Sequence, residues 1–427
     1  MSQLLLQILS TSNMTLALKQ VKRNKGRAGL DGITVDEIEQ YIRANWQDIK
    51  GQIIHRKYKP TPVLRAEIPK PDGSKRNLGI PTVMDRIIQQ AIVQVLTPLC
   101  EPHFSEYSYG FRPGRSCEDA IMQLLSYLND GYEWIVDIDL EKFFDNVPQD
   151  RLMSRVHELI HDGDVESLIR KYLQAGVQIM GVYHESTQGT PQGGNLSPLL
   201  SNIMLNELDK ELTKRGLQFT RYADDCIIAV SSEAAAKRVM YSVSRYIEQK
   251  LGLKVNMTKT KITRPNKLKY LGFGFYKNTK SRQWAPRPHQ ESIARFERKL
   301  KQLSKRSWSV SLTQRIEKLN QVIRGWVNYY SVSSMKTRLK RIDEHLRTRI
   351  RVVIWKQWKT KRKRLWGLAK LGMPKGMADK VSGWGDHYQF VALKSGIQYY
   401  ITKDILRIRG LISIYDYYIK RHALKVN

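Results

Sequence analysis

The sequence contains little cysteine and no long apolar run, and both absences narrow the class of protein. Its 427 residues include three cysteines, Cys100, Cys117 and Cys226, with neither a disulfide framework nor the paired spacing of a zinc site. No stretch approaches the roughly 18 apolar residues that a membrane span needs. The first residues lack the basic segment and cleavage site of a secretion signal. We therefore expect a cytoplasmic protein in a reducing compartment, with no membrane partner.

Acidic residues are also scarce. The chain has 72 Lys and Arg against 40 Asp and Glu, which gives a formal net charge of +32. A field of this strength attracts polyanions, most often nucleic acid, with ribosome-type binding and a membrane surface as alternatives. A chain of this length that is 41% hydrophobic is expected to form two or three domains with a sizeable core.

Two of the few acids stand side by side within an apolar segment. Asp224 and Asp225 lie between Tyr222 and the apolar run 226–230, a pattern typical of a β-hairpin with the acids at its turn. Adjacent carboxylates repel each other in a half-buried turn unless a cation neutralises them. Carboxylate oxygens suit Mg²⁺. A solvated Asp-Asp turn is the alternative.

A second acidic element occupies residues 133–145. The alternation of apolar side chains predicts a strand that sends Asp137 and Asp139 to one face. Unpaired carboxylates on an apolar strand are costly to bury, so a cation shared with the Asp224-Asp225 hairpin is the economical arrangement. The residues alone leave open which of the two acids is the ligand.

Two loops have a composition that is typical of contacts with phosphates or bases. Residues 64–80 predict a hairpin whose arms carry Lys70 and Arg76, placed to clasp a triphosphate unless the tip is merely solvated. The glycine-rich stretch 188–198 opens a helix and offers backbone N–H groups, although many such loops are plain turns.

Aromatic and arginine residues alternate in the loop at residues 107–116. Phe111, Arg112 and Arg115 suit stacked bases and phosphates. Packing of the Tyr109 and Phe111 rings into the core is the alternative.

The last third is strongly basic. Between Arg295 and Arg364 there are 22 Lys or Arg against four acids, and three apolar stripes recur at helical spacing. With the stripes buried, a three-helix module with a basic exterior remains, and folded or duplex RNA is its natural partner.

Taken in order, these residues resemble the bacterial group II intron reverse transcriptases, also called maturases. The resemblance rests on five motifs at the order and spacing of the family: Phe-Arg-Pro-Gly-Arg, Asp-Ile-Asp-Leu-Glu-Lys-Phe-Phe-Asp, Gly-Thr-Pro-Gln-Gly-Gly-Asn-Leu-Ser-Pro, Tyr-Ala-Asp-Asp and Tyr-Leu-Gly-Phe. It implies an α+β right-hand polymerase. Fingers and palm with an antiparallel sheet would span residues 1–275, a helical thumb (maturase X domain) residues 276–365, and a small C-terminal nucleic-acid-binding segment residues 366–427.

The resemblance also implies an RNA-directed DNA polymerase with two Mg²⁺ ions held by Asp139, Asp224 and Asp225. Asp139 is preferred to Asp137 because it lies five residues before Phe144, the spacing at which similar polymerases place the aromatic that excludes a ribose 2′-hydroxyl. A core position for Phe144 is the alternative. The expected nucleotide-binding residues are Lys70, Arg76, Phe144, Gln192 and Lys259. The expected template- or RNA-binding residues are Arg112, Arg115, Arg338 and Arg349.

The implied partners are group II intron RNA, a DNA primer and target DNA, and deoxynucleoside triphosphates, bound by a monomer or homodimer. The protein would extend a primer on intron RNA, promote splicing and support retrohoming. A splicing-only, RNA-binding maturase with an idle polymerase site is the alternative. An RNA-dependent RNA polymerase is disfavoured by the bulky Phe144.

Overall fold

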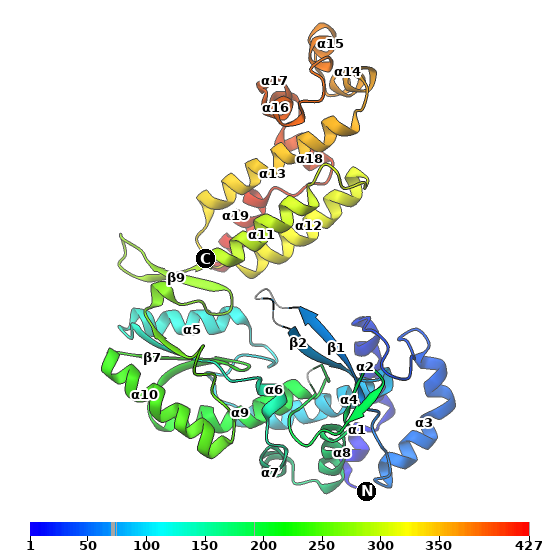
Figure 1. The fold of residues 1–427 in the computed structure, drawn as a ribbon, viewed down its shortest axis with the longest axis vertical. Coiled ribbons are helices and arrows are strands. Elements are labelled where there is room, and N and C mark those ends of the chain that lie inside the picture. The colour runs from blue at the N-terminus through cyan, green and yellow to red at the C-terminus, as the bar shows by residue number, and fades with distance from the viewer. Residues whose placement is uncertain (70–72, 74, 192, 427) are drawn as a thin grey trace. The chain divides into compact units, whose positions relative to one another are not determined.

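The structure is a computed structural model that describes residues 1–69, 73, 75–191 and 193–426. The chain divides into two compact units, Met1–Arg264 and Pro265–Asn427 (Figure 1). The described strands form two four-stranded sheets in the first unit and a two-stranded sheet in the second. Helices accompany them in both units, which confirms the predicted α+β class.

An antiparallel sheet in the first unit carries both acidic motifs. Its strands lie in the order β6-β7-β3-β8. Their bounds are β3 (Trp134–Ile138), β6 (Gln218–Tyr222), β7 (Asp225–Val230) and β8 (Lys261–Thr263). The predicted hairpin and the predicted acidic strand are therefore neighbours. Residues 226–230 of β7 are buried because α5 (Cys117–Asn129) and α10 (Glu233–Tyr246) cover the sheet, on opposite faces in Figure 1.

The predicted basic hairpin belongs to the other sheet of this unit. β1 (Val63–Pro69) and β2 (Lys75–Ile80) pair antiparallel, with Ile68 opposite Arg76. β1 also pairs in parallel with β4 (Val177–Ile179), which pairs with β5 (Val182–His184). The sheet order is β2-β1-β4-β5.

Helices α4 (Val83–Cys100) and α9 (Ser197–Lys214) supply much of the core of the first unit. The apolar spacing at residues 85–101 forms α4 as predicted, and α9 starts directly after the glycine-rich loop. The other helical segments here are α1 (Gln3–Ile8), α2 (Thr11–Arg23), α3 (Ile38–Ile54), η1 (Glu101–His103), α6 (Phe143–Asn146), α7 (Gln149–Ile160), α8 (Gly163–Leu173) and η2 (Ile247–Leu251).

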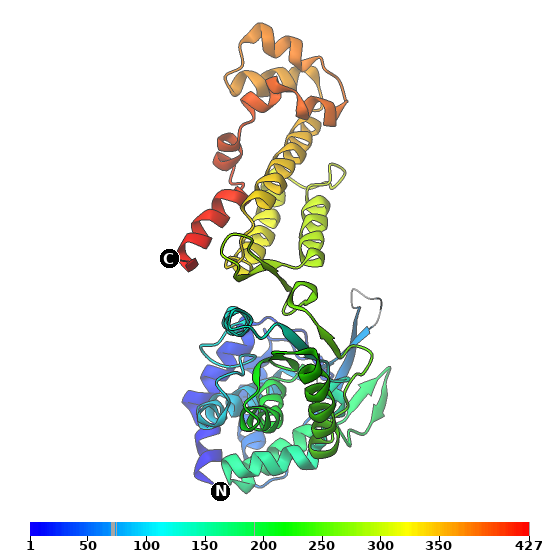
Figure 2. The same cartoon turned by 90° about the vertical axis from the view of Figure 1, so that its left-hand side faces the viewer.

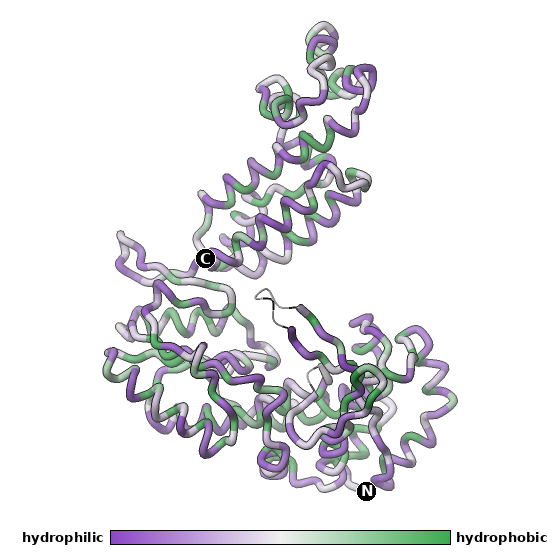
Figure 3. The backbone as a smooth tube through the Cα atoms, in the orientation of Figure 1, coloured by the Kyte–Doolittle hydropathy of each residue, from purple (hydrophilic) through white to green (hydrophobic). Residues whose placement is uncertain are grey.

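The second unit contains the predicted basic three-helix module. Figures 1 and 2 show α11 (Gln290–Leu303), α12 (Leu312–Tyr329) and α13 (Lys336–Gln357) side by side. The predicted stripes are buried, for example at Phe296, Ile323 and Leu346. Figure 3 accordingly shows hydrophobic and hydrophilic residues alternating along these helices.

The rest of the second unit is a hairpin and a set of short helices. Their bounds are η3 (Pro265–Lys267), β9 (Phe273–Lys277), β10 (Trp284–Pro288), α14 (Lys361–Lys370), α15 (Lys375–Ser382), α16 (Tyr388–Leu393), α17 (Ser395–Tyr400), α18 (Lys403–Ile408) and α19 (Ile414–Val426). Across the described part of the chain, no helix combines the length and apolar character that a membrane crossing requires.

Candidate active site

The sheet register brings the two acidic motifs to one place. Ile138 of β3 pairs with Cys226 of β7, so one further step along the register sets Asp139 opposite Asp225. Side chains alternate between the faces of a sheet, and Asp137, Asp139 and Asp225 consequently share a face. Asp224 lies next to them in the two-residue turn, after Ala223, whose φ of +57° is left-handed.

Asp139 is fixed just beyond the end of its strand. Its backbone N–H donates to Thr260 Oγ1 at 3.2 Å, and its carbonyl accepts from the N–H of Asn256 at 2.8 Å. The segment after η2 therefore determines where this carboxylate emerges.

Asp139, Asp224 and Asp225 line one pocket of about 700 Å³. Arg76, Phe144 and Lys259, which the sequence assigned to nucleotide binding, line the same pocket. The other lining residues are Lys75, Asn77, Leu140, Glu141, Lys142, Phe143, Asp145, Asn256 and Thr258. Residues from the basic hairpin, the acidic strand and the Asp-Asp turn thus meet around one space.

The pocket carboxylates act strongly on one another. Asp225 reaches solvent in the pocket, yet partial desolvation and then the charges of Asp224, Asp137 and Asp139 raise its pKa to about 7, against a smaller lowering by Arg76. Burial likewise raises the pKa of Asp137 to about 6, although Lys261 opposes this shift. Ionising all these acids together is unfavourable without a cation, which is the property that a metal-binding carboxylate set has.

Asp137 and Asp139 differ in their neighbours. Asp137 lies within the strand and forms an ion pair with Lys261 at 3.7 Å, whereas Asp139 lines the pocket. The cation beside Asp137 already offsets part of its charge.

The carboxylate set fits Mg²⁺ in its chemistry, because all the donors are oxygen atoms and the crowded charges favour a divalent cation. Over the described residues, however, no three His, Cys, Asp or Glu side chains are drawn together closely enough to form a metal-holding group. The donors are present around the pocket without being gathered into a ligand cluster.

The glycine-rich loop packs against the segment that carries Phe144. The N–H of Thr190 donates to the carbonyl of Phe144 at 2.7 Å, and that of Gly189 to the carbonyl of Val147 at 2.8 Å. A Cβ on Gly189 would lie 2.7 Å from the carbonyl oxygens of Phe144 and Asp145, and its φ is +83°. Only glycine allows this approach. Phe144 is half-buried, while the adjacent Phe143 is in the core.

A buried arginine holds the turn that bears Asp224. Arg221 and Asp209 are both fully buried and form a two-point ion pair, Nε–Oδ1 at 2.7 Å and Nη2–Oδ2 at 2.5 Å. Arg221 Nη1 also donates to the carbonyl of Ala223 at 2.8 Å and to Asn202 Oδ1 at 3.1 Å. Helix α9 is thereby tied to the Asp-Asp turn. We call Arg221, Asp209 and Asn202 the arginine clamp.

The loop at 107–116 supports the same turn from another side. The N–H of Tyr109 donates to the carbonyl of Arg221 at 2.8 Å, and the N–H of Arg221 donates to the carbonyl of Tyr107 at 2.9 Å. A Cβ on Gly110 would lie 2.2 Å from the backbone N of Ala223, so this position requires glycine.

The two aromatic rings of this loop differ in their exposure. The Tyr109 ring is buried and packs in the core, whereas the Phe111 ring is exposed and free to stack on a base.

Arg112, which the sequence assigned to template binding, turns its side chain into the protein. Its side chain is buried and forms an ion pair with Glu101 at 3.0 Å, and Nη1 donates to the carbonyls of Ser105 and Ser108. These contacts use its donors inside the protein, so Arg112 shapes the loop. Arg115 is partly exposed, with its guanidinium over the Tyr109 ring. Lys70 and Gln192 lie outside the described residues.

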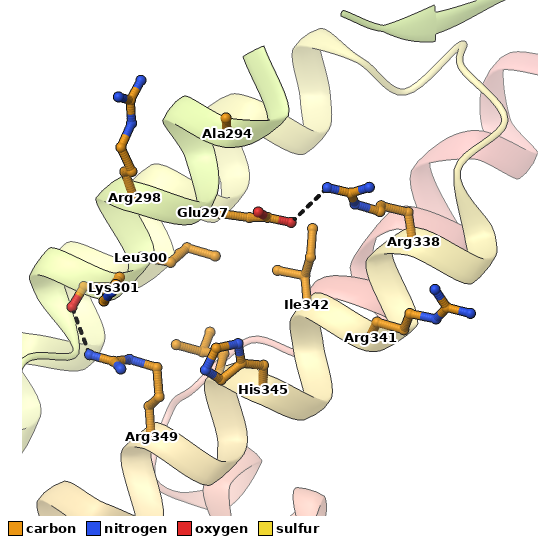
Figure 4. Close-up of a pocket in the computed structure, with 11 residues that line it drawn as sticks. Ala294, Glu297, Arg298, Leu300, Lys301, Arg338, Arg341, Ile342, His345 and Arg349 are labelled. Carbon is orange, nitrogen blue, oxygen red and sulfur yellow. Dashed lines mark hydrogen bonds and ion pairs between the residues drawn. The ribbon is translucent and has the colours of Figure 1, made fainter. Parts of the chain in front are cut away.

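Arg338 and Arg349 line a groove of about 510 Å³ between α11 and α13 (Figure 4). Arg338 forms an ion pair with Glu297 at 3.2 Å, and Arg349 donates to the carbonyl of Lys301 at 2.9 Å. Figure 4 shows Arg298 and Arg341 extending away from the groove. Most of the charge around it is positive.

Several residues of the site were missed from the sequence. Asn256 and Thr258 line the acid pocket, yet nothing in their local pattern marks them. The arginine clamp was missed as well, because Asp209 lies among Glu207, Lys210 and Glu211 in the sequence and only the fold shows that it is buried.

Comparisons with known proteins agree with this geometry. Residues 68–275 match the family described as "Reverse transcriptase (RNA-dependent DNA polymerase)". Residues 293–372, which include α12 and α13, match the "Group II intron, maturase-specific domain".

Similar proteins include Protein YkfC of Escherichia coli K12, 33% identical over 276 residues, which are 56% of this chain and 72% of that protein. The group II intron-encoded protein LtrA of Lactococcus lactis is 37% identical over 213 residues, 50% of this chain and 35% of LtrA. A putative COX1/OXI3 intron 2 protein of Saccharomyces cerevisiae is 30% identical over 349 residues, 67% of this chain and 40% of that protein. The chain thus spans well under half the length of the last two.

Solved structures give weaker matches. A Cas6-RT-Cas1–Cas2 complex is 24% identical with a TM-score of 0.38, covering 58% of this chain and 43% of the other. Apo telomerase from Candida tropicalis is 16% identical with a TM-score of 0.42, covering 56% and 60%.

The two matched domains, the intron-encoded relatives and the predicted motifs lead to one assignment. The chain belongs to the group II intron reverse transcriptases, in which an RNA-dependent DNA polymerase domain of right-hand α+β fold is joined to a maturase-specific domain.

Proposed function

We propose that this protein extends a DNA primer on group II intron RNA and also binds that RNA to promote splicing and retrohoming. The polymerase proposal rests on one pocket that is lined by both acids and cations. These residues are Asp139, Asp224, Asp225, Arg76 and Lys259. Acids and cations arranged around one open space suit a reaction that transfers a charged phosphoryl group.

In this proposal Asp139, Asp224 and Asp225 hold two Mg²⁺ ions. Bound magnesium supplies Lewis-acid stabilisation of the phosphoryl oxygens and favours the ionised primer hydroxyl. The position of Asp139 on the pocket wall supports Asp139 as the ligand, and Asp137 as a neighbour whose charge makes the local potential more negative.

The cations of the pocket would orient the incoming triphosphate. Arg76 extends from β2, and Lys259 lies near the segment that fixes Asp139. Both side chains are exposed, so they can pair with phosphate oxygens without first losing a buried partner. Phe144, half-buried on the pocket wall, would exclude a ribose 2′-hydroxyl by its bulk. For Lys70 and Gln192, nucleotide binding remains a prediction from the sequence alone.

The three-helix module would bind RNA as a thumb, with residues 276–365 as its extent and residues 1–275 as fingers and palm. Its cations, including Arg338 and Arg349 at the groove between α11 and α13, support this role. Residues 366–427 would add a nucleic-acid-binding segment.

The test is primer extension on an RNA template with Mg²⁺. Asp224→Asn should lower the rate of primer extension at least about 10³-fold. The substitution removes the negative charge and one carboxylate oxygen of a proposed metal ligand, and with them part of the electrostatic stabilisation of the transition state. RNA binding measured by filter retention should stay within about twofold. Persistent extension by Asp224→Asn would remove the metal assignment, whereas wild-type protein that binds RNA without extending a primer would favour a splicing-only maturase.

A further inference from the structure

The chain between η2 and β8 leaves the sheet beside the acid pocket. β3 pairs with β8 as far as Asp137, which lies opposite Lys261. The next pairing along the chain joins Leu140 to Val255. Residues 256–260 therefore bulge out of the ladder between these two pairings, and we call them the 256–260 bulge. Bulges of this kind redirect side chains at the edge of a site.

The two ends of the 256–260 bulge hold the backbone of Asp139. The N–H of Asp139 donates to Thr260 Oγ1 at 3.2 Å, and its carbonyl accepts from the N–H of Asn256 at 2.8 Å. Thr260 is buried, with 8% of its surface exposed. A backbone N–H in a buried place needs an acceptor, and here a side-chain hydroxyl supplies it where a regular ladder would use a carbonyl. The position of Asp139 thus depends on the identity of one side chain.

The same bulge carries Lys259 into the acid pocket. The carbonyl of Asn256 accepts from the N–H of Lys259 at 3.1 Å and from that of Thr260 at 2.8 Å. Thr258 Oγ1 donates to Asn256 Oδ1 at 2.7 Å, which closes the turn. Asn256, Thr258 and Lys259 line the pocket together with Asp139. Thr260 therefore connects the turn that bears the pocket cation to the strand that bears the pocket acid.

We propose that Thr260 is a positioning residue for the polymerase reaction and acts through the backbone of Asp139. Its hydroxyl fixes where the carboxylate of Asp139 emerges and how the turn with Lys259 sits beside it. Thr260 is not among the residues that line the acid pocket, so it acts on a substrate through these two neighbours. Small displacements of groups that orient reacting atoms are costly to the rate. The inference rests on the polymerase function proposed above.

The first test needs neither metal nor catalysis. Thr260→Val keeps the side-chain shape and removes the hydroxyl that accepts from Asp139. In chelator, hydrogen exchange at the amide of Asp139, followed by mass spectrometry, should speed up about three- to tenfold, the effect of one hydrogen bond. Thr260→Ser retains the hydroxyl and should restore slow exchange.

The second test is primer extension over a Mg²⁺ series. Thr260→Val should lower kcat and raise the Mg²⁺ concentration for half-maximal rate, each about three- to tenfold. The Kd for the RNA–DNA duplex should stay within about twofold, and Thr260→Ser should again behave as the wild type. A residue that serves global stability alone would lower the unfolding midpoint without moving the Mg²⁺ dependence.

Thr263→Val is the matched control. Thr263 lies on the same strand outside the pocket, and its Oγ1 donates to the carbonyl of Arg264 at 3.3 Å. It should leave exchange at Asp139 and the Mg²⁺ dependence unaltered.

Unchanged exchange at Asp139 in Thr260→Val would overturn the proposal, as would faster exchange with an unchanged Mg²⁺ dependence. If Thr260→Val does not fold, Thr260→Ala, which also lacks the hydroxyl, is judged by the same two measurements. A wild-type protein that extends no primer would remove the polymerase function, whereas exchange at Asp139 would still report whether Thr260 holds it.

Discussion

At Asp225, the charges of three other carboxylates act on one side chain. Desolvation and these charges raise its pKa to about 7 from the usual 3.8. The folded state therefore holds this proton more tightly than the unfolded chain does. The contribution of Asp225 to folding stability is therefore greatest at low pH, where its carboxyl is protonated in both states. This contribution is lost as the pH rises from about 3.8, the pKa in the unfolded chain, through about 7, the pKa in the folded protein.

Removing the charge of Asp225 should therefore stabilise the metal-free protein at high pH. In chelator, Asp225→Asn is expected to raise the unfolding midpoint by about 2–4 °C near pH 8, the shift for about 1 kcal/mol in a unit of this size. Little change is expected near pH 4, where the wild-type carboxyl is protonated. Calorimetry at both pH values checks this, and equal shifts at both would rule out the crowding of charges as the cause.

Phe144 provides the second prediction at the scale of one residue. Phe144→Ala should raise kcat/KM for ribonucleotides relative to deoxyribonucleotides by about tenfold or more, because the side chain that contacts the sugar edge is removed. Phe144→Tyr retains the ring and should retain the discrimination. Single-nucleotide insertion kinetics give both ratios. Unchanged discrimination in Phe144→Ala would return this residue to a purely packing role against Phe143.

The hairpin β6–β7 is the element on which the candidate site depends, and the arginine clamp fixes its turn. A buried ion pair contributes little net stability, because desolvation offsets the attraction between the charges. Arg221 also donates to the carbonyl of Ala223, so the ion pair holds the backbone of the turn in place. It restrains the left-handed residue directly before Asp224.

Arg221→Lys should loosen this turn, because a lysine keeps the charge but cannot reach Asp209, Asn202 and Ala223 together. We expect amide hydrogen exchange across residues 222–226 to rise at least about tenfold, and kcat for extension to fall more than KM for the nucleotide. Asp343→Asn is the control, since Asp343 also belongs to a buried ion pair, with Arg347 in α13. It should leave exchange at the turn unaltered. A lower unfolding midpoint for Arg221→Lys without faster exchange would show that the clamp supports only global stability.

At the scale of the whole molecule, the excess of 32 positive charges favours a polyanionic partner. Most basic side chains of α11, α12 and α13 remain outside because the apolar stripes of these helices are buried, whereas Arg315 and Arg351 are buried with the stripes. Binding that depends on such charges releases counterions from RNA and weakens steeply with salt.

Removing two outward-facing cations from the three-helix module should reduce this salt dependence. The double variant Arg298→Gln with Arg341→Gln is expected to lower the slope of log K against log salt by about 1.4–1.8, if each side chain contacts one phosphate. The control removes the same charge from α9 and α10, as Lys210→Gln with Lys237→Gln. RNA titrations over a salt series measure the slopes, and equal losses in both variants would show that net charge alone, and no particular surface, binds RNA.

The sequence by itself determined the acidic strand, the Asp-Asp hairpin, the basic hairpin and the three amphipathic helices. These features depend on local alternation and helical spacing, which a chain carries within a few residues. It also indicated that the acids of the 133–145 strand and the Asp224-Asp225 pair share a cation, because crowded carboxylates are costly to bury unpaired, while the preference for Asp139 over Asp137 came from the family resemblance.

Only the tertiary structure decided which side chains share a space. The pairing of β3 with β7 brought Asp139 and Asp225 to one pocket. Packing of the loop at 107–116 turned Arg112 inward to Glu101 and left Phe111 exposed. The clamp joins residues 202, 209 and 221 through contacts that no local pattern encodes. Burial and partnership arise from chain segments far apart in the sequence, so they become visible only once the elements are packed together.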